Sequence, residues 1–282
     1  MDVLQVLILA VVQGAAELLP VSSSAHVIVA EKLMGLDPTA PAMTLLLVML
    51  HTGTMFAVIV YFWQAWRQTY FSSTAAFRTQ MGYVVLGTAV TGVVGLILKQ
   101  LIEAGVSASA PGFEIEHLFG NARLMAAALA CAGVLIIWSS RLQDSGSGEL
   151  TLRRAAWIGA VQGLCLPFRG FSRSGATISA GMVLGLARRR AEEFSFALAV
   201  AITPVAIARE AWRLLKAQSA MTLGHSGASV WSSFGPGLLG MLFSFGAGLL
   251  ALRWLSRWLE QGRWHFFGAY CLVAALVVLW VG

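Results

Sequence analysis

Two polar segments, about 150 residues apart, interrupt an otherwise apolar chain with the same residue types. The first, Gln13–His26, holds a Gln-Gly pair, a glutamate, a Leu-Pro step, three serines and a histidine. The second, Gln162–Thr177, holds a Gln-Gly pair, a Leu-Pro step and a Ser-Arg-Ser run. Charged and imidazole groups are costly in hydrocarbon and mark function there. Polar segments broken by Gly and Pro at matching places in two halves indicate a site at a repeat interface.

The carboxylate of the first segment requires a positive partner. Gln13 and Glu17 are four residues apart, so they share one face of a helix. A carboxylate buried in a membrane needs a metal ion or an arginine beside it. Mg²⁺ and Ca²⁺ prefer oxygen ligands, so Glu17 and the amide oxygen of Gln13 are candidate metal ligands. The alternative is a structural ion pair between Glu17 and an arginine.

The serines and the histidine that follow have the residue types of a nucleophile and its base. One serine is enough to cap the helix that starts here, and three are present. His26 lies three residues after Ser23, which brings an imidazole near a hydroxyl group. The sequence therefore predicts catalytic roles for Glu17, Ser23 and His26. The alternative for His26 is a hydrogen-bonded core residue.

The second segment is suited to an anion. The run from Ser172 to Thr177 opens a helix, whose N-terminus offers free amide donors. Arg173 adds a planar fork that matches phosphate oxygens, and is assigned a catalytic role. Arg169 is a further cation, for which snorkelling is the alternative. The candidate substrate-binding residues are Ser22, Arg169, Ser172, Ser174, Gly175 and Thr177.

The composition is that of a polytopic helical membrane protein. The 282 residues are 58% hydrophobic and only 11% charged, against roughly 25% charged in soluble domains. A membrane span needs about 20 apolar residues. Six stretches are long enough, at about 42–66, 80–102, 121–140, 190–212, 234–256 and 264–281. Four shorter pieces, at about 3–18, 23–36, 152–166 and 174–187, meet in pairs at the two polar segments and predict two re-entrant helix hairpins.

One hairpin and three spans make up each half, so the fold class is an all-α inverted-topology repeat within a single membrane domain, 1–282. The first repeat covers 1–145, and the second, inverted repeat covers 146–282. Arginines collect on one side, which should be cytoplasmic and which also accounts for the net charge of +6 without nucleic acid. These are Arg67, Arg78, Arg141, Arg153, Arg154, Arg188, Arg189, Arg190, Arg253, Arg257 and Arg263.

A carboxylate, a histidine, hydroxyls and arginines in one membrane cavity indicate a site for a phosphorylated lipid. Phosphoryl transfer depends mainly on positioning and charge neutralisation, which these groups supply. The first hypothesis is a lipid phosphate or diphosphate hydrolase. A transporter or flippase for such a lipid is the competing class, because inverted repeats with broken helices are also typical of transporters. A structural partner that retains a vestigial site is a third hypothesis.

These motifs resemble the undecaprenyl-diphosphate phosphatases of the bacitracin-resistance type (BacA/UppP), over essentially the whole chain. The first motif of that family is matched by Gln13, by Glu17 and by Leu19–Ser23 followed by His26. Its Ser-Arg-Ser-Gly-Ala-Thr run is matched in full by Ser172–Thr177. The segment Pro167–Phe171 departs from the family's shorter Pro-Gly turn, and Gln13 is the amide variant of the first position.

The resemblance implies hydrolysis of undecaprenyl diphosphate to the monophosphate carrier lipid, with a requirement for Mg²⁺ or Ca²⁺. It implies a multi-pass protein of the bacterial inner membrane with its site open to the periplasm, a role in peptidoglycan synthesis, and bacitracin resistance. The expected partners are a polyprenyl diphosphate lipid and the membrane, and a homodimer is compatible with the sequence. Ser23, His26 and water all stay open as the nucleophile.

Overall fold

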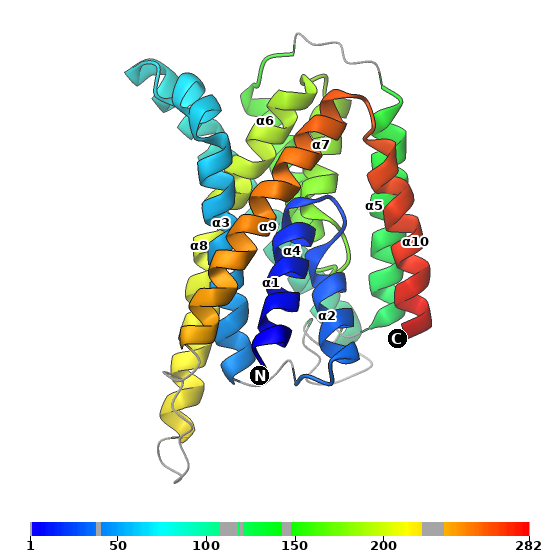
Figure 1. Ribbon diagram of the computed structural model, residues 1–282. Helices are drawn as coiled ribbons and strands as arrows, with labels where there is room; N and C mark the ends of the chain where they lie inside the picture. The colour runs from blue at the N-terminus through cyan, green and yellow to red at the C-terminus, as the bar shows by residue number, and fades with distance from the viewer. Residues whose placement is uncertain are drawn as a thin grey trace.

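The computed structural model describes residues 2–37, 41–107, 115, 118, 121–142, 148–221 and 234–281. Figure 1 shows that these residues form a bundle of helices. The described part contains ten helices: α1 (Val3–Leu18), α2 (Ser23–Leu33), α3 (Pro41–Tyr70), α4 (Thr74–Ser107), α5 (Ala122–Ser140), α6 (Leu152–Cys165), α7 (Arg173–Val183), α8 (Arg188–Met221), α9 (Phe234–Glu260) and α10 (His265–Val281). The expectation of an all-helical chain is therefore confirmed for these residues.

Five helices are long and apolar enough to cross a membrane. Their candidate spans are Met43–Tyr70, Thr74–Val106, Ala122–Ser140, Arg188–Arg209 and Gly235–Glu260. Each overlaps a span that the sequence predicts. The sixth predicted span, 264–281, coincides with α10, which is apolar but has only 17 residues.

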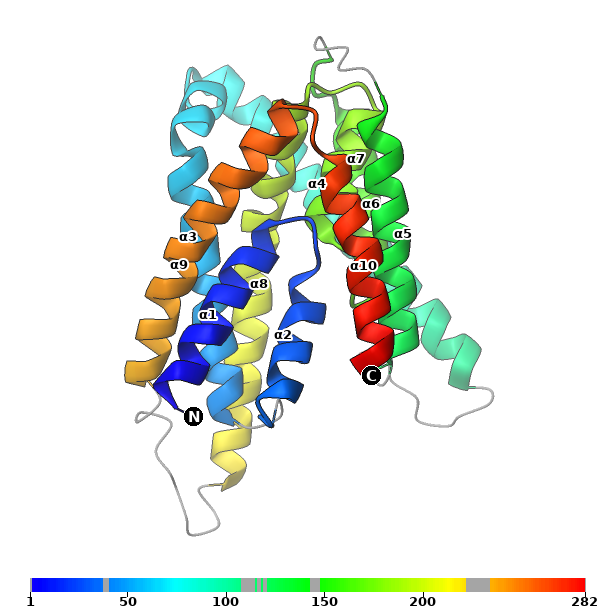
Figure 2. The same ribbon diagram turned by 45° about the vertical axis from the view of Figure 1, so that its right-hand side comes forward.

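The four shorter apolar pieces form two helix pairs, α1–α2 and α6–α7. The first helix of each pair ends at a Leu-Pro step, α1 before Pro20 and α6 before Pro167. Proline cannot donate a helical hydrogen bond, so both helices end before it. Leu19, before Pro20, is extended, whereas Leu166, before Pro167, keeps helical backbone angles. Figure 2 shows α1 and α2 side by side, joined by a loop in the middle of the molecule. In Figure 1 they lie in the lower half, and α6 and α7 lie in the upper half.

Each helix pair packs against a long helix from the other half of the chain. Helix α1 lies on α9, and α6 lies on α4. The glycines of the two Gln-Gly motifs make these contacts possible. A Cβ atom on Gly14 would lie 2.6 Å from the Ser244 carbonyl oxygen of α9, and one on Gly163 would lie 2.8 Å from the Thr91 carbonyl oxygen of α4. The two motifs therefore perform the same packing task in the two halves.

Candidate active site between the two helix pairs

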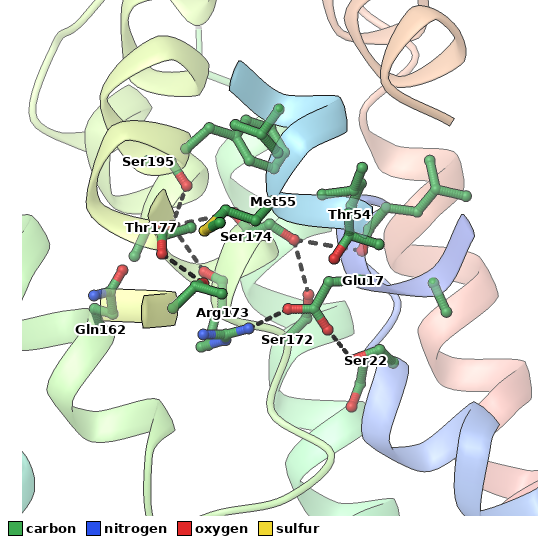
Figure 3. A pocket seen from close by; sticks show the side chains of 18 of the residues that line it. Glu17, Ser22, Thr54, Met55, Gln162, Ser172, Arg173, Ser174, Thr177 and Ser195 are labelled. Atoms are coloured by element: carbon green, nitrogen blue, oxygen red, sulfur yellow. Dashed lines mark hydrogen bonds and ion pairs between the residues drawn. The ribbon is translucent and has the colours of Figure 1, made fainter. Parts of the chain in front are cut away.

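A cavity lies where the two helix pairs meet, and Figure 3 shows the side chains around it. One side consists of the end of α1, the α1–α2 loop and the start of α7, and is polar. The other side consists of α3 and α8 and is mainly apolar, with Met55, Val58, Phe196, Ala199 and Val200 beside three hydroxyl residues. A polar wall beside a mainly apolar wall suits a molecule with a charged head and a hydrocarbon chain.

Glu17 is the centre of the polar wall. One carboxylate oxygen, Oε1, forms an ion pair with Nη2 of Arg173, which comes from the other helix pair. The other oxygen, Oε2, accepts hydrogen bonds from Ser23 Oγ at 2.5 Å and from Gln13 Nε2 at 3.1 Å. His51 Nε2, on α3, lies 3.8 Å from the same oxygen. The predicted pairing of Glu17 with an arginine is present, and it joins the two halves of the chain.

The start of α7 faces the α1–α2 loop and carries most of the predicted anion-binding residues. Ser172 Oγ accepts a hydrogen bond from the Gly175 amide at 3.2 Å and so caps the helix. Ser174 Oγ donates to the Leu19 carbonyl oxygen at 3.4 Å, which ties the two segments together. A Cβ atom on Gly175 would lie 3.2 Å from Pro20 Cβ, so a glycine permits this close approach.

Most of the predicted site residues line this cavity. Glu17, Ser22, Ser23, Ser172, Arg173, Ser174 and Thr177 are in its wall. Thr177 points its hydroxyl toward Ser195 of α8, with the two oxygens 2.5 Å apart. Gly175 is buried directly behind the wall.

Besides Gly175, three predicted residues are not in the wall of the cavity: Gln13, Arg169 and His26. Arg169 is exposed in the α6–α7 loop, and its charge acts on Glu31 of α2. His26 directs Nδ1 at the Ser22 carbonyl oxygen, 2.8 Å away, and Nε2 at the Tyr270 hydroxyl, 2.7 Å away. The sequence pairs Ser23 with His26, whereas in the structure the Ser23 hydroxyl bonds to Glu17. Helix α2 begins at Ser23, so the two side chains leave the same turn in different directions.

The cavity also contains polar residues to which the sequence assigns no role. Thr54 of α3 and Ser195 and Thr203 of α8 line it. These residues lie in long apolar helices without a motif around them, so only the packing of α3 and α8 reveals them. Gln162 also lines the cavity, and the sequence does mark this residue, because it occupies the place of Gln13 in the second Gln-Gly pair. Its Nε2 lies 3.4 Å from Thr91 Oγ1.

Glu17 provides the carboxylate that the cavity wall offers to a cation. Among the described residues, no group of three or more His, Cys, Asp or Glu side chains is arranged to hold a metal ion. Glu17 offers one carboxylate, and the Gln13 amide would have to turn its oxygen inward. Mg²⁺ commonly binds through one or two carboxylates together with substrate phosphates, and keeps several waters.

A bundle of apolar helices with a partly buried Glu–Arg pair defines a membrane protein with a polar internal site. The chain matches the family model described as "Bacitracin resistance protein BacA" over residues 6–277, and it belongs to that family. It is 62% identical over 279 residues to "Undecaprenyl-diphosphatase 2" of Acinetobacter baylyi, and the alignment covers 99% of this chain and 98% of that protein. It is 34% identical over 302 residues to "Undecaprenyl-diphosphatase" of Desulfosudis oleivorans, with 100% and 99% covered. "Undecaprenyl-diphosphatase 2" of Burkholderia ambifaria is 34% identical over 286 residues, with 96% and 94% covered.

Proposed function

We propose that this chain is an undecaprenyl-diphosphate phosphatase, which uses water to convert the diphosphate lipid into undecaprenyl phosphate and inorganic phosphate. The observation that carries the proposal is the Glu17–Arg173 pair inside the cavity, with Ser23 hydrogen-bonded to the same carboxylate. The proposal is supported by the 62% identical relative, whose name states this activity. A buried site with an arginine, helix amides and a hydroxyl has the parts that phosphoryl transfer requires.

Binding begins at Arg173 and the start of α7. The guanidinium group is paired with Glu17 and presents a planar fork to the cavity, so a terminal phosphate can exchange places with the carboxylate. The hydroxyls of Ser172 and Ser174 and the amides at the N-terminus of α7 add donors for the remaining phosphate oxygens. The apolar wall of α3 and α8 then receives the first carbons of the isoprenoid chain.

Movement of Arg173 to the phosphate prepares Glu17 to act as a base. While the ion pair holds, Arg173 neutralises the charge of the carboxylate. After the exchange, Oε2 is free to take the proton of Ser23, whose oxygen is already 2.5 Å away. Ser23 Oγ then attacks the terminal phosphorus, and the bond to the bridging oxygen breaks to release undecaprenyl phosphate. Water hydrolyses the phosphoserine, and the proton returns to Ser23.

A divalent cation, Mg²⁺ or Ca²⁺, would be held by Glu17 and the Gln13 amide oxygen together with the substrate. It would neutralise negative charge on the diphosphate. The other contributions come from the chain itself. Before the cation binds, Gln13 Nε2 donates to Glu17, and on binding Arg173 and the α7 amides orient the terminal phosphate.

For the membrane arrangement we propose six spans, α3, α4, α5, α8, α9 and α10, and two re-entrant hairpins related by an inverted repeat. The exchanged packing of α1 on α9 and α6 on α4 supports this symmetry. The arginine-rich side would face the cytoplasm, so the site opens toward the periplasm of the inner membrane. The lipid released there would serve as carrier for peptidoglycan synthesis, and removal of its diphosphate form would confer bacitracin resistance.

Topology can be measured by labelling single cysteines in intact cells, after the exposed Cys131 has been replaced by alanine. We expect Gln261→Cys to react only from the cytoplasm and Leu33→Cys only from outside. Reaction of both positions from the same side would contradict the inverted arrangement.

The activity is tested by phosphate release from undecaprenyl diphosphate in detergent, with purified protein and with and without a metal chelator. We expect release that stops on chelation and returns when Mg²⁺ or Ca²⁺ is added. Arg173→Lys serves as the control for contaminating phosphatases. A folded protein that binds the lipid, or moves it across vesicles, without releasing phosphate would refute the proposal in favour of a transporter.

A further inference from the structure

Helix α10 contacts the first helix pair through two consecutive residues, Tyr270 and Cys271. The Tyr270 hydroxyl lies 2.7 Å from His26 Nε2, and the two rings stack with centroids 5.6 Å apart at 13°. The Cys271 thiol donates to the Pro20 carbonyl oxygen at 3.1 Å. Helix α10 otherwise packs mainly on α5, and Figure 2 shows it on the α2 side of the molecule. The polar contacts of α10 with the first helix pair are therefore made at His26 and Pro20.

His26 in turn holds the backbone of Ser22. Ser22 has φ 67° and ψ 96°, and it is the one non-glycine residue with positive φ in the described part of the chain. Such a conformation is unfavourable for a residue with a Cβ atom and persists only where the surroundings impose it. The Ser22 carbonyl oxygen accepts from His26 Nδ1 at 2.8 Å, and the helical amide of His26 is farther away, at 3.5 Å. The hydrogen bond from the imidazole is thus the shorter of the two that the Ser22 carbonyl oxygen accepts.

These contacts define the protonation of the ring. A backbone carbonyl only accepts hydrogen bonds, so Nδ1 must carry the hydrogen. In the neutral ring Nε2 then has the lone pair and accepts the Tyr270 hydroxyl. Both nitrogens are engaged, and neither is directed at Ser23, whose hydroxyl bonds to Glu17.

We infer that Tyr270 and His26 are positioning residues of the active site: Tyr270 orients the His26 ring, and His26 holds Ser22 in its left-handed conformation so that Ser23 points at Glu17. This inference rests on the proposed phosphatase function and assigns His26 a different part in it from base or nucleophile. Residue Ser22 is the link, because its backbone sets the direction in which Ser23 leaves the turn. The second half of the chain thereby supports the nucleophile of the first.

Tyr270→Phe is the first test, because it keeps the stacked ring and removes only the hydroxyl. Loss of one such hydrogen bond corresponds to roughly a two- to tenfold change in a rate or equilibrium constant. We expect kcat to fall by that factor with KM unchanged, because lipid binding does not depend on the orientation of the Ser23 side chain. Tyr83→Phe, the same change on α4, is the matched control and should match the wild type. A Tyr270→Phe enzyme with wild-type kcat would overturn the role of Tyr270.

The second test separates positioning from proton transfer at His26. The amide nitrogen of asparagine branches from the same carbon as Nδ1, so His26→Asn retains a donor for the Ser22 carbonyl. The amide of glutamine reaches the place of Nε2, so His26→Gln loses it. We expect His26→Asn to stay within about tenfold of the wild-type kcat and His26→Gln to fall at least about tenfold below it. Neither amide accepts a proton at neutral pH, so equal and large losses of about 10²-fold or more would show that His26 acts as a base or nucleophile.

The outcomes distinguish this inference from the proposed function. A wild-type protein that releases no phosphate refutes the proposed function and the inference together. Phosphate release by the wild type, combined with an unaffected Tyr270→Phe or with equal losses in the two His26 variants, refutes the inference alone.

Discussion

The two helix pairs have the same construction and carry opposite chemistry. Each begins with a helix that packs a Gln-Gly motif against a long helix of the other half, and each first helix stops at a Leu-Pro step. The first pair then provides Glu17 and Ser23, an acid and a hydroxyl, whereas the second provides Arg173 and a capped helix N-terminus. The repeated features build the scaffold, and the features that differ between the pairs build the site. A repeat can thus supply two complementary halves of one active site.

The largest expected effect comes from Ser23, the proposed nucleophile, which opens α2 where Arg173 opens α7. Ser23→Ala should lower kcat by at least about 10³-fold while lipid binding remains, because Arg173 and the α7 amides are unchanged. Ser24→Ala removes a neighbouring hydroxyl that bonds to Ser22 rather than to Glu17, and should lose far less. The measurement is steady-state phosphate release. Appreciable turnover by Ser23→Ala would point to water or His26 as the attacking group.

The next effect concerns the cation that the second pair supplies. Arg173→Lys should lower kcat/KM by about 10²- to 10³-fold, because an ammonium group cannot reproduce the two parallel donors of a guanidinium. Arg169→Lys is the matched change in the same helix pair. Since Arg169 is exposed outside the cavity, its effect should stay within about threefold. Similar losses in both variants would mean that the whole loop, rather than Arg173, binds the phosphate.

The smallest effect concerns the glycines that both pairs share, and it lowers the stability of the fold rather than the activity. Gly14→Ala and Gly163→Ala should each destabilise the fold by about 1–3 kcal/mol, because the new methyl group would meet backbone of α9 or α4. Gly82→Ala on α4 is the control, since nothing lies within 4 Å of its Cβ position. Thermal unfolding in detergent measures all three variants. A clear difference between Gly14→Ala and Gly163→Ala would break the equivalence of the two pairs.

The sequence predicts much of this molecule because membranes constrain it strongly. Apolar length located the long helices, and Pro20 and Pro167 mark where the short helices α1 and α6 stop. The Glu17–Arg173 pair was predictable because a buried carboxylate requires a cation. The surroundings of His26 were not predictable. The spacing along α2 places His26 near Ser23, but it cannot reveal that Nε2 of His26 bonds to the hydroxyl of Tyr270, 244 residues later. Thr54 and Thr203 were missed for the same reason, because only packing brings α3 and α8 to the site.

The central claim is that Glu17 of the first pair and Arg173 of the second form one catalytic unit. A double-mutant cycle tests it most directly, with kcat/KM for phosphate release measured in Glu17→Gln, in Arg173→Lys and in the variant with both changes. Residues that act as a unit show strongly non-additive losses. We predict that the double variant stays within about threefold of the more damaged single variant. Losses that multiply, to roughly 10⁴-fold or more, would show two independent contributions and contradict the claim.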